Sequence, residues 1–145
     1  MSELVRIWVC KEPKKSWSAD VINVFNVFGV SYILSKGIPD SDSSDVILCG
    51  PKVAKKISFL RANEKGYKDC VVLCVPQGSG KRGLDSLKST SQISPVVALE
   101  NDYNGALACV QMLAVKRRDD KLLSKVLAYK KELRDTVLRK KLKNI

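Results

Sequence analysis

The chain has 145 residues, of which 45% are hydrophobic and 28% charged, a balance typical of one folded domain with its own core. It contains no histidine, which excludes Ser-His-Asp and Cys-His catalysis, and the additional lack of a CxxC pair argues against a zinc site. The formal net charge of +11 suits attraction to nucleic acid, anionic lipid or an acidic protein, although a solvated, lysine-rich helix would give the same charge.

The cysteines and the lengths of the apolar runs indicate the cellular compartment of the protein. Five cysteines are present, an odd number, and most lie in apolar runs, so we expect reduced, buried thiols. Residues 1–10 do not have the pattern of a signal peptide, and no window approaches the roughly 18 consecutive apolar residues of a membrane span. The sequence therefore predicts a cytoplasmic protein without a membrane span.

Strands and helices alternate along the sequence. In chain order we expect a strand over residues 4–10, a helix over 17–28, strands over 30–34 and 45–50, a helix over 51–62, strands over 69–75 and 95–99, and helices over 103–115 and 119–142. The strands are apolar and rich in β-branched residues, whereas the helices have apolar residues at helical spacing. This alternation predicts a parallel sheet with helices on both faces.

Helix boundaries are marked by residues that favour caps. We expect Ser16 or Ser18 to cap the first helix, Gly29 to end it, and Asp119 or Asp120 to cap the last one. The second and third strands are joined by only about ten loop residues, 35–44, whereas a parallel crossover usually needs a dozen or more. Either this connection is unusually tight or it replaces a helix.

A glycine-rich segment follows the fourth strand. Gln77–Arg82 contains Gly-Ser-Gly-Lys, but the spacing of its glycines and the arginine after the lysine do not fit a Walker A loop, which argues against a nucleoside triphosphatase. Backbone amides and two cations could still hold one phosphate there. A plain surface loop explains the same composition.

The second half of the chain resembles the aminoimidazole ribonucleotide carboxylase/mutase family of purine biosynthesis (PurE-type). Three segments carry the resemblance: Gly83-Leu-Asp-Ser-Leu87, the strand Pro95-Val-Val-Ala-Leu99, and the alanine-rich helix Asn101–Ala114 with its Gln-Met-Leu ending. A long C-terminal helix follows in that family as it does here. The resemblance implies a three-layer α/β/α fold with a flavodoxin-like parallel sheet of five strands and a long C-terminal helix.

The first half resembles the same family more weakly. Arg6–Cys10 corresponds to its first strand, Ser16-Trp17 to the entry of its first helix, and Phe28–Tyr32 to the link into its second strand. Val46–Gly50 and Cys74–Pro76 correspond to the ends of its third and fourth strands. The resemblance therefore covers nearly the whole chain.

Three loops depart from the family pattern. The family's Gly-Ser-x-Ser-Asp loop is replaced by Glu12–Ser16, its Ser-Ala-His-Arg loop is reduced to Ser35–Ser44, and its Gly-Gly-x-Ala-His loop is replaced by Gly50–Lys56. The histidine that the family is thought to use for proton transfer is therefore absent, and no other residue is expected to be catalytic. Lys56 or Cys49 could substitute for it, but no pattern singles them out.

The resemblance also implies where a ligand and a partner would bind. By family position, the ligand-binding candidates are Lys14, Lys15, Ser16, Gly50, Lys52, Gly78, Ser79, Gly80 and Lys81. Residues 1–118 would form the PurE-type α/β domain, and residues 119–145 would form a basic amphipathic helix of the same domain that makes assembly contacts. The family forms octamers, so we expect a homo-oligomer or a mixed assembly with a paralogue. No metal and no cofactor are expected.

Three functional hypotheses follow. The first is a catalytically inactive PurE-like protein that acts as a structural or binding subunit. The second is a divergent enzyme that binds aminoimidazole ribonucleotide and transfers a carboxylate. The third is a basic α/β module whose C-terminal helix binds nucleic acid, another polyanion or an acidic partner.

Overall fold

The computed structural model describes residues 5–11, 17–39, 44–63, 65–67, 70–75, 97–98 and 101–143. In these ranges the elements are β1 (Val5–Lys11), α1 (Ala19–Phe28), β2 (Tyr32–Lys36), β3 (Ser44–Cys49), α2 (Pro51–Ala62), β4 (Val71–Cys74), β5 (Val97–Ala98), α4 (Asp102–Lys116) and α5 (Asp120–Lys143). The predicted mixed α/β fold with a long C-terminal helix is confirmed.

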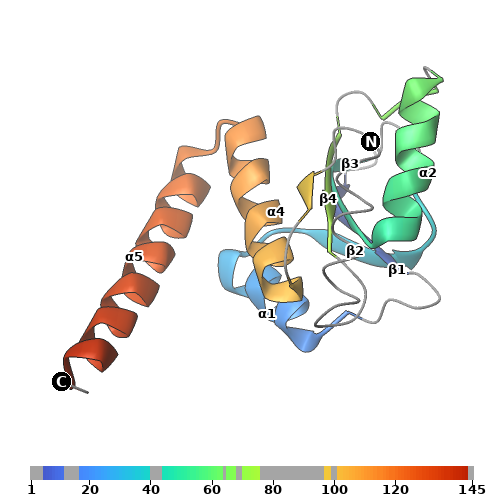
Figure 1. Ribbon diagram of the computed structural model, residues 1–145. Coiled ribbons are helices and arrows are strands. Elements are labelled where there is room, and N and C mark those ends of the chain that lie inside the picture. Colours follow the sequence, from blue (N-terminus) through green and yellow to red (C-terminus); the bar gives the residue numbers. More distant parts are fainter. Residues whose placement is uncertain are drawn as a thin grey trace.

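All strands run parallel in one sheet with the order β2-β1-β3-β4-β5 (Figure 1). β1 to β4 are four to seven residues long and form the main part of the sheet. The fifth strand expected over residues 95–99 is not seen as a full strand. Its described part is the two-residue segment β5, in which Val97 pairs with Leu73 and Ala98 with Cys74.

Helices cover both faces of the sheet. α1 and α4 lie on one face, α2 lies on the other, and α5 packs outside α4 and α1 (Figure 1). Residues of β1, β3 and β4 alternate between two buried clusters: Ile7, Val9, Val46, Leu48 and Leu73 face α1 and α4, whereas Cys10, Ile47, Cys49, Val72 and Cys74 face α2. Covering on both faces explains why the inner stretches of these strands, Ile7–Cys10, Val46–Cys49 and Val71–Cys74, are apolar at every position.

Gly105 determines how closely α4 approaches the sheet. It is buried, and a Cβ atom at this position would lie 2.6 Å from Cγ2 of Val75 and 3.2 Å from Cδ1 of Leu48. Val75 and Leu48 are themselves buried in the core. Only glycine therefore fits here without displacing a packed side chain.

The boundaries of α1 differ in part from the prediction. Gly29 ends the helix in the left-handed conformation, as expected, and the Val30 amide donates to the Phe25 carbonyl. Val30 is thereby held in the helix exit, which is why β2 begins at Tyr32 rather than at residue 30. Ser18 is at the N-cap position, but its side chain makes no capping hydrogen bond.

The described start of the link from β2 to β3, residues 37–39, lies on the α2 side of the sheet. Ile38 packs into the cluster beneath α2, and the Tyr67 hydroxyl donates to the Pro39 carbonyl at 2.6 Å. Tyr67 belongs to the connection from α2 to β4, so two connections hold each other in place. The described part of this link thus covers the sheet with one apolar side chain and a proline.

The two C-terminal helices have local caps. Asn101 caps α4, because its Oδ1 accepts from the Asn104 amide at 2.8 Å. Asp119 caps α5, because its Oδ1 accepts from the Leu122 amide at 3.1 Å, which confirms one of the two expected caps. Arg117 ends α4 and forms a bidentate ion pair with Asp45 of β3, with N–O distances of 2.7 and 3.0 Å. This pair fixes the α4–α5 turn to the sheet.

Candidate functional site

The carboxyl ends of the strands form the edge at which open parallel sheets usually bind ligands. β1 ends there at Lys11, β3 at Cys49 and β4 at Cys74, and α1, α2 and α4 begin there. The N-termini of α1 and α4 are neighbours, because the Ser18 amide donates to Oδ2 of Asp102 at 2.8 Å. This contact could not be predicted from the sequence, since the two residues are far apart in the chain.

Two of the predicted ligand-binding residues lie in the described part of the chain. Gly50 is the N-cap of α2 and is buried, and Lys52 lies exposed in the first turn of that helix. The others, Lys14, Lys15 and Ser16 together with Gly78, Ser79, Gly80 and Lys81, lie outside the described residues. The predicted site is therefore placed only at its α2 end.

The helix N-termini at this edge differ in charge. Asp20 lies in the first turn of α1, and Asp102, in the first turn of α4, also accepts from the amide preceding α1. These carboxylates occupy the positive ends of both helix dipoles and disfavour a phosphate there. α2 has no acidic residue in its first turn and has Lys52 instead. Of these three N-termini, that of α2 is the most favourable for an anion.

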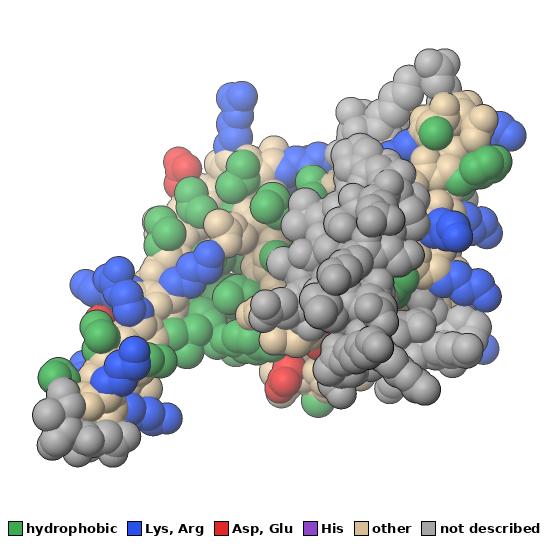
Figure 2. Space-filling view, in the orientation of Figure 1, with side chains coloured by type: hydrophobic (Ala, Val, Ile, Leu, Met, Phe, Trp, Pro, Cys, Tyr) green, Lys and Arg blue, Asp and Glu red, His purple; other side chains and the backbone are tan. Residues whose placement is uncertain are grey.

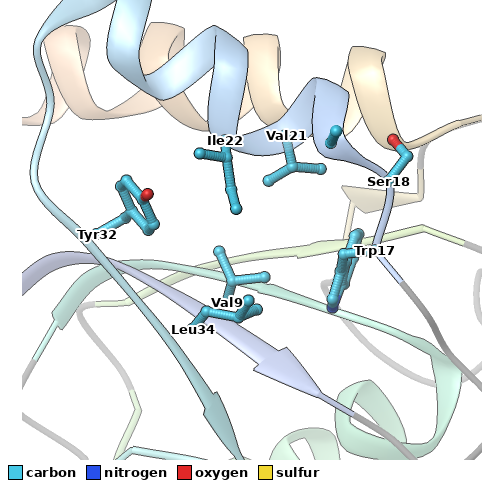
Figure 3. Close-up of a pocket in the computed structure, with 8 residues that line it drawn as sticks. Val9, Trp17, Ser18, Val21, Ile22, Tyr32 and Leu34 are labelled. Carbon is cyan, nitrogen blue, oxygen red and sulfur yellow. The ribbon is translucent and has the colours of Figure 1, made fainter.

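A cavity of about 250 Å³ lies between α1 and the β1–β2 edge of the sheet (Figure 3). Its lining residues are Val9, Trp17, Ser18, Ala19, Val21, Ile22, Tyr32 and Leu34. Trp17 is held in place by a hydrogen bond from its Nε1 to the Cys10 carbonyl at 2.9 Å. This cavity could not be predicted from the sequence, because a void arises from the packing of side chains and no residue pattern indicates one.

All five cysteines are buried and unpaired as disulfides, as predicted. Cys49 and Cys74 are register partners in neighbouring strands, and the Cys49 thiol donates to the Leu73 carbonyl at 3.6 Å. Burial raises the pKa of the Cys109 thiol well above its usual value. Lys56, the other residue considered as a histidine substitute, is exposed on α2, whereas Cys49 is fully buried. The two do not form a buried acid–base pair.

α5 is covered by the domain over only part of its length. Leu122 and Val126 are buried, and Tyr129 contacts both the Phe28 ring, at a centroid distance of 5.4 Å, and the Tyr103 hydroxyl. Lys130 contacts α4 through a 2.6 Å hydrogen bond from its Nζ to Oε1 of Gln111. Beyond this point the helix extends away from the domain (Figure 1).

The uncovered part of α5 is both apolar and basic. Its large apolar side chains are Leu133, Val137, Leu138 and Leu142, and they are between 41% (Leu133) and 69% (Leu142) exposed. Lysine and arginine side chains lie among them along the helix (Figure 2). α5 contains nine basic and three acidic residues, so an unpartnered, positively charged apolar surface projects from the domain.

Searches for other kinds of site and for relatives gave no assignment. Among the described residues, no group of three or more His, Cys, Asp or Glu side chains is arranged to hold a metal ion. Within the same part of the chain, no helix has both the length and the apolar composition needed to cross a membrane. Comparison of the chain with protein-family models and with curated proteins found no match.

Proposed function

We propose that the protein is a binding or structural subunit on a flavodoxin-like, PurE-type scaffold that lacks that family's histidine chemistry. The strand order 2-1-3-4-5 with helices on both faces supports the scaffold, because it is the order of flavodoxin-like doubly wound sheets. The absence of histidine supports the loss of proton transfer near neutral pH. Five buried cysteines that form no disulfide suit a reducing, cytoplasmic environment.

The single observation that carries the proposal is the partly covered stripe of α5. Leu122, Val126 and Tyr129 pack on the domain, and Leu133 and Val137 continue the same helical line at spacings of three and four residues. Their exposure therefore arises because the domain ends, while the pattern of a buried helix face continues. A surface of this kind favours burial against another protein.

The partner in this proposal is a second copy of the chain. Burying one large apolar side chain contributes about 1.5–3 kcal/mol, so covering several of them would offset much of the cost of association. Lys130, Arg134 and Lys141 lie between the apolar positions, so two α5 helices side by side would bring like charges together. We therefore expect α5 to pack on the body of the second copy, and salt to strengthen the assembly by screening repulsion.

Light scattering coupled to size exclusion tests the assembly. We expect a molar mass of two or more chains. The assembled fraction should rise between 50 and 500 mM salt, over which the Debye length falls by on the order of threefold. Leu133→Glu/Val137→Glu should give a monomer. The matched control Ser124→Glu/Ala128→Glu adds the same charge at two exposed positions on the opposite side of α5 and should still assemble. A monomeric wild-type chain at all salt concentrations contradicts self-assembly.

A second candidate is binding of an acidic protein or another polyanion through the same helix. The observation that favours it is the excess of basic residues among the apolar positions of α5. Its salt dependence has the opposite sign, because binding that releases counterions weakens as salt rises. Titration with polyglutamate and with a short RNA at both salt concentrations distinguishes this candidate from self-assembly.

The divergent-enzyme hypothesis makes a different prediction. An enzyme of the resembled family would bind aminoimidazole ribonucleotide saturably, and this binding would survive high salt. We expect no such binding in a calorimetric titration, because Asp20 and Asp102 carry negative charge at the N-termini of α1 and α4. Saturable binding at 500 mM salt, where the Debye length is about 4 Å, would overturn the non-catalytic assignment. Turnover would then be measured.

A further inference from the structure

We infer that the cavity beneath α1 is a binding site for a small, neutral, planar apolar molecule. This inference concerns a different surface from α5 and does not rest on the assembly proposed above. The cavity has a volume of about 250 Å³, and its described lining residues come from β1, β2, α1 and the segment that precedes α1. It lies next to β2, the edge strand of the sheet, where a small molecule can enter without separating two inner strands.

Aliphatic side chains form the two broad walls. Val21 and Ile22 of α1 point towards Val9 of β1 and Leu34 of β2, and the space lies between them (Figure 3). Ala19, also on α1, contributes only a methyl group to the lining. This geometry is a flat slot between a helix and a sheet, which suits a planar molecule.

Two aromatic rings close the ends of the slot, and both are held by contacts outside it. The Trp17 indole donates to the Cys10 carbonyl at 2.9 Å, so its one polar atom is already engaged. The Tyr32 ring packs against Phe25 with a centroid distance of 5.3 Å and an interplanar angle of 39°. Walls positioned in this way favour an aromatic ligand, which gains ring contacts with little reordering of the protein.

The charges near the slot select against an anion. Ser18 lines the cavity, and its amide donates to the Asp102 carboxylate instead of facing a free ligand. Asp20 adds a second carboxylate in the first turn of α1. Apolar cavities of this general size stay dry and take up benzene-like molecules, which supports a neutral ligand.

Ligand-observed saturation-transfer NMR on the full chain, with indole and the indole-3-carboxylate anion as probes, tests the inference. We expect indole to bind saturably with a Kd of about 1 mM or tighter, and the anion to bind at least about tenfold more weakly. Ile22→Phe fills the slot and should abolish indole binding. Val27→Phe makes a similar enlargement on the exposed side of α1 and should leave binding unchanged.

Each outcome decides the inference. Thermal melts first establish that Ile22→Phe and Val27→Phe are folded, and Ala19→Leu replaces the first variant if it is not. Loss of indole binding in the filling variant alone supports the site. No saturable binding by the wild-type chain, equal binding by the filled variant, or equal binding of the carboxylate overturns it. None of these results depends on the oligomeric state, so the inference and the proposed function can fail separately.

Discussion

Gly105 shows at the scale of one residue how α4 is seated on the sheet. Replacing it with alanine improves helix propensity by about 1 kcal/mol, but the new methyl group would lie 2.6 Å from Val75 Cγ2. Overpacking of a filled core typically costs about 1–3 kcal/mol, so after the gain in helix propensity we expect Gly105→Ala to lower the free energy of unfolding by up to about 2 kcal/mol. Urea denaturation measures the change. Asn104→Ala, at the exposed neighbouring position, is the control and should be neutral or slightly stabilising.

A tyrosine pair links α4 to α5 and should make stability depend on alkaline pH. Burial, together with the hydrogen bond to Tyr129, raises the pKa of Tyr103 to about 12 from its ordinary value of 10.0. The folded state therefore keeps this proton between about pH 10 and 12, whereas the unfolded chain releases it. The stabilisation is complete below pH 10 and is lost as the pH rises to 12.

The comparison of wild type with Tyr103→Phe isolates this effect, because other groups titrate in the same range. We expect the stability advantage of the wild type to shrink as the pH rises from 10 to 12 in chemical denaturation experiments. A difference that stays constant across this interval would show that the Tyr103 hydroxyl does not titrate as the geometry implies.

Some residues could be predicted from the sequence because their roles are local. Gly29 ends α1 in the left-handed conformation that glycine favours, and Asp119 caps a helix that starts one residue later. The contact between Ser18 and Asp102 could not be predicted in this way. It depends on α1 and α4, whose N-termini meet because the strands that precede them, β1 and β5, belong to the same sheet.

At the scale of elements, the buried strands were the clearest signal and the edge strand the weakest. β3 and β4 are apolar at nearly every position because both faces are covered, and their expected positions differ from the observed ones by at most two residues. β2 is an edge strand with an exposed Ile33, so fewer of its positions have to be apolar. Its start is set by the helix exit at Val30, which is a tertiary constraint.

The ion pair between Asp45 and Arg117 is the contact that orients the α4–α5 turn. Asp45 is buried, with Arg117 at 2.7 Å and Lys116 at 3.5 Å. Asp45→Asn removes the charge but keeps the shape, and it leaves two cations without their carboxylate. Charge-assisted hydrogen bonds contribute about 1.5–3 kcal/mol, so we expect a loss near the lower end, since Arg117 is partly solvated.

Thermal denaturation of Asp45→Asn beside Asp135→Asn measures this contribution. Asp135 is a less buried carboxylate on the projecting part of α5, and its replacement should change the melting temperature little. If Asp45→Asn melts at the same temperature as the control Asp135→Asn, the turn is held by packing alone.

At the scale of the whole molecule, the candidate site could be predicted only in part. The position of Gly50 could be predicted from the apolar strand before it and from Pro51 in the first turn of a helix, and Gly50 is indeed the N-cap of α2. The cavity beneath α1 could not be predicted, because Ala19, Ile22 and Tyr32 each have residue types that also fit a filled core. Whether side chains from three elements leave a void depends on how the helix sits on the sheet.

The division of α5 into a docked part and a projecting part gives the last prediction. A chain ending at residue 130 keeps Leu122, Leu123, Val126 and Tyr129, the α5 side chains that contact the core. We therefore expect it to fold with a melting temperature close to that of the wild type under conditions in which both chains are monomeric, since assembly itself adds stability. A chain ending at residue 118 lacks these side chains and uncovers Phe28, so it should be unfolded or strongly destabilised. If the chain ending at residue 130 melts like the one ending at residue 118, the distal half of α5 belongs to the fold itself, and its apolar stripe is not a separate assembly surface.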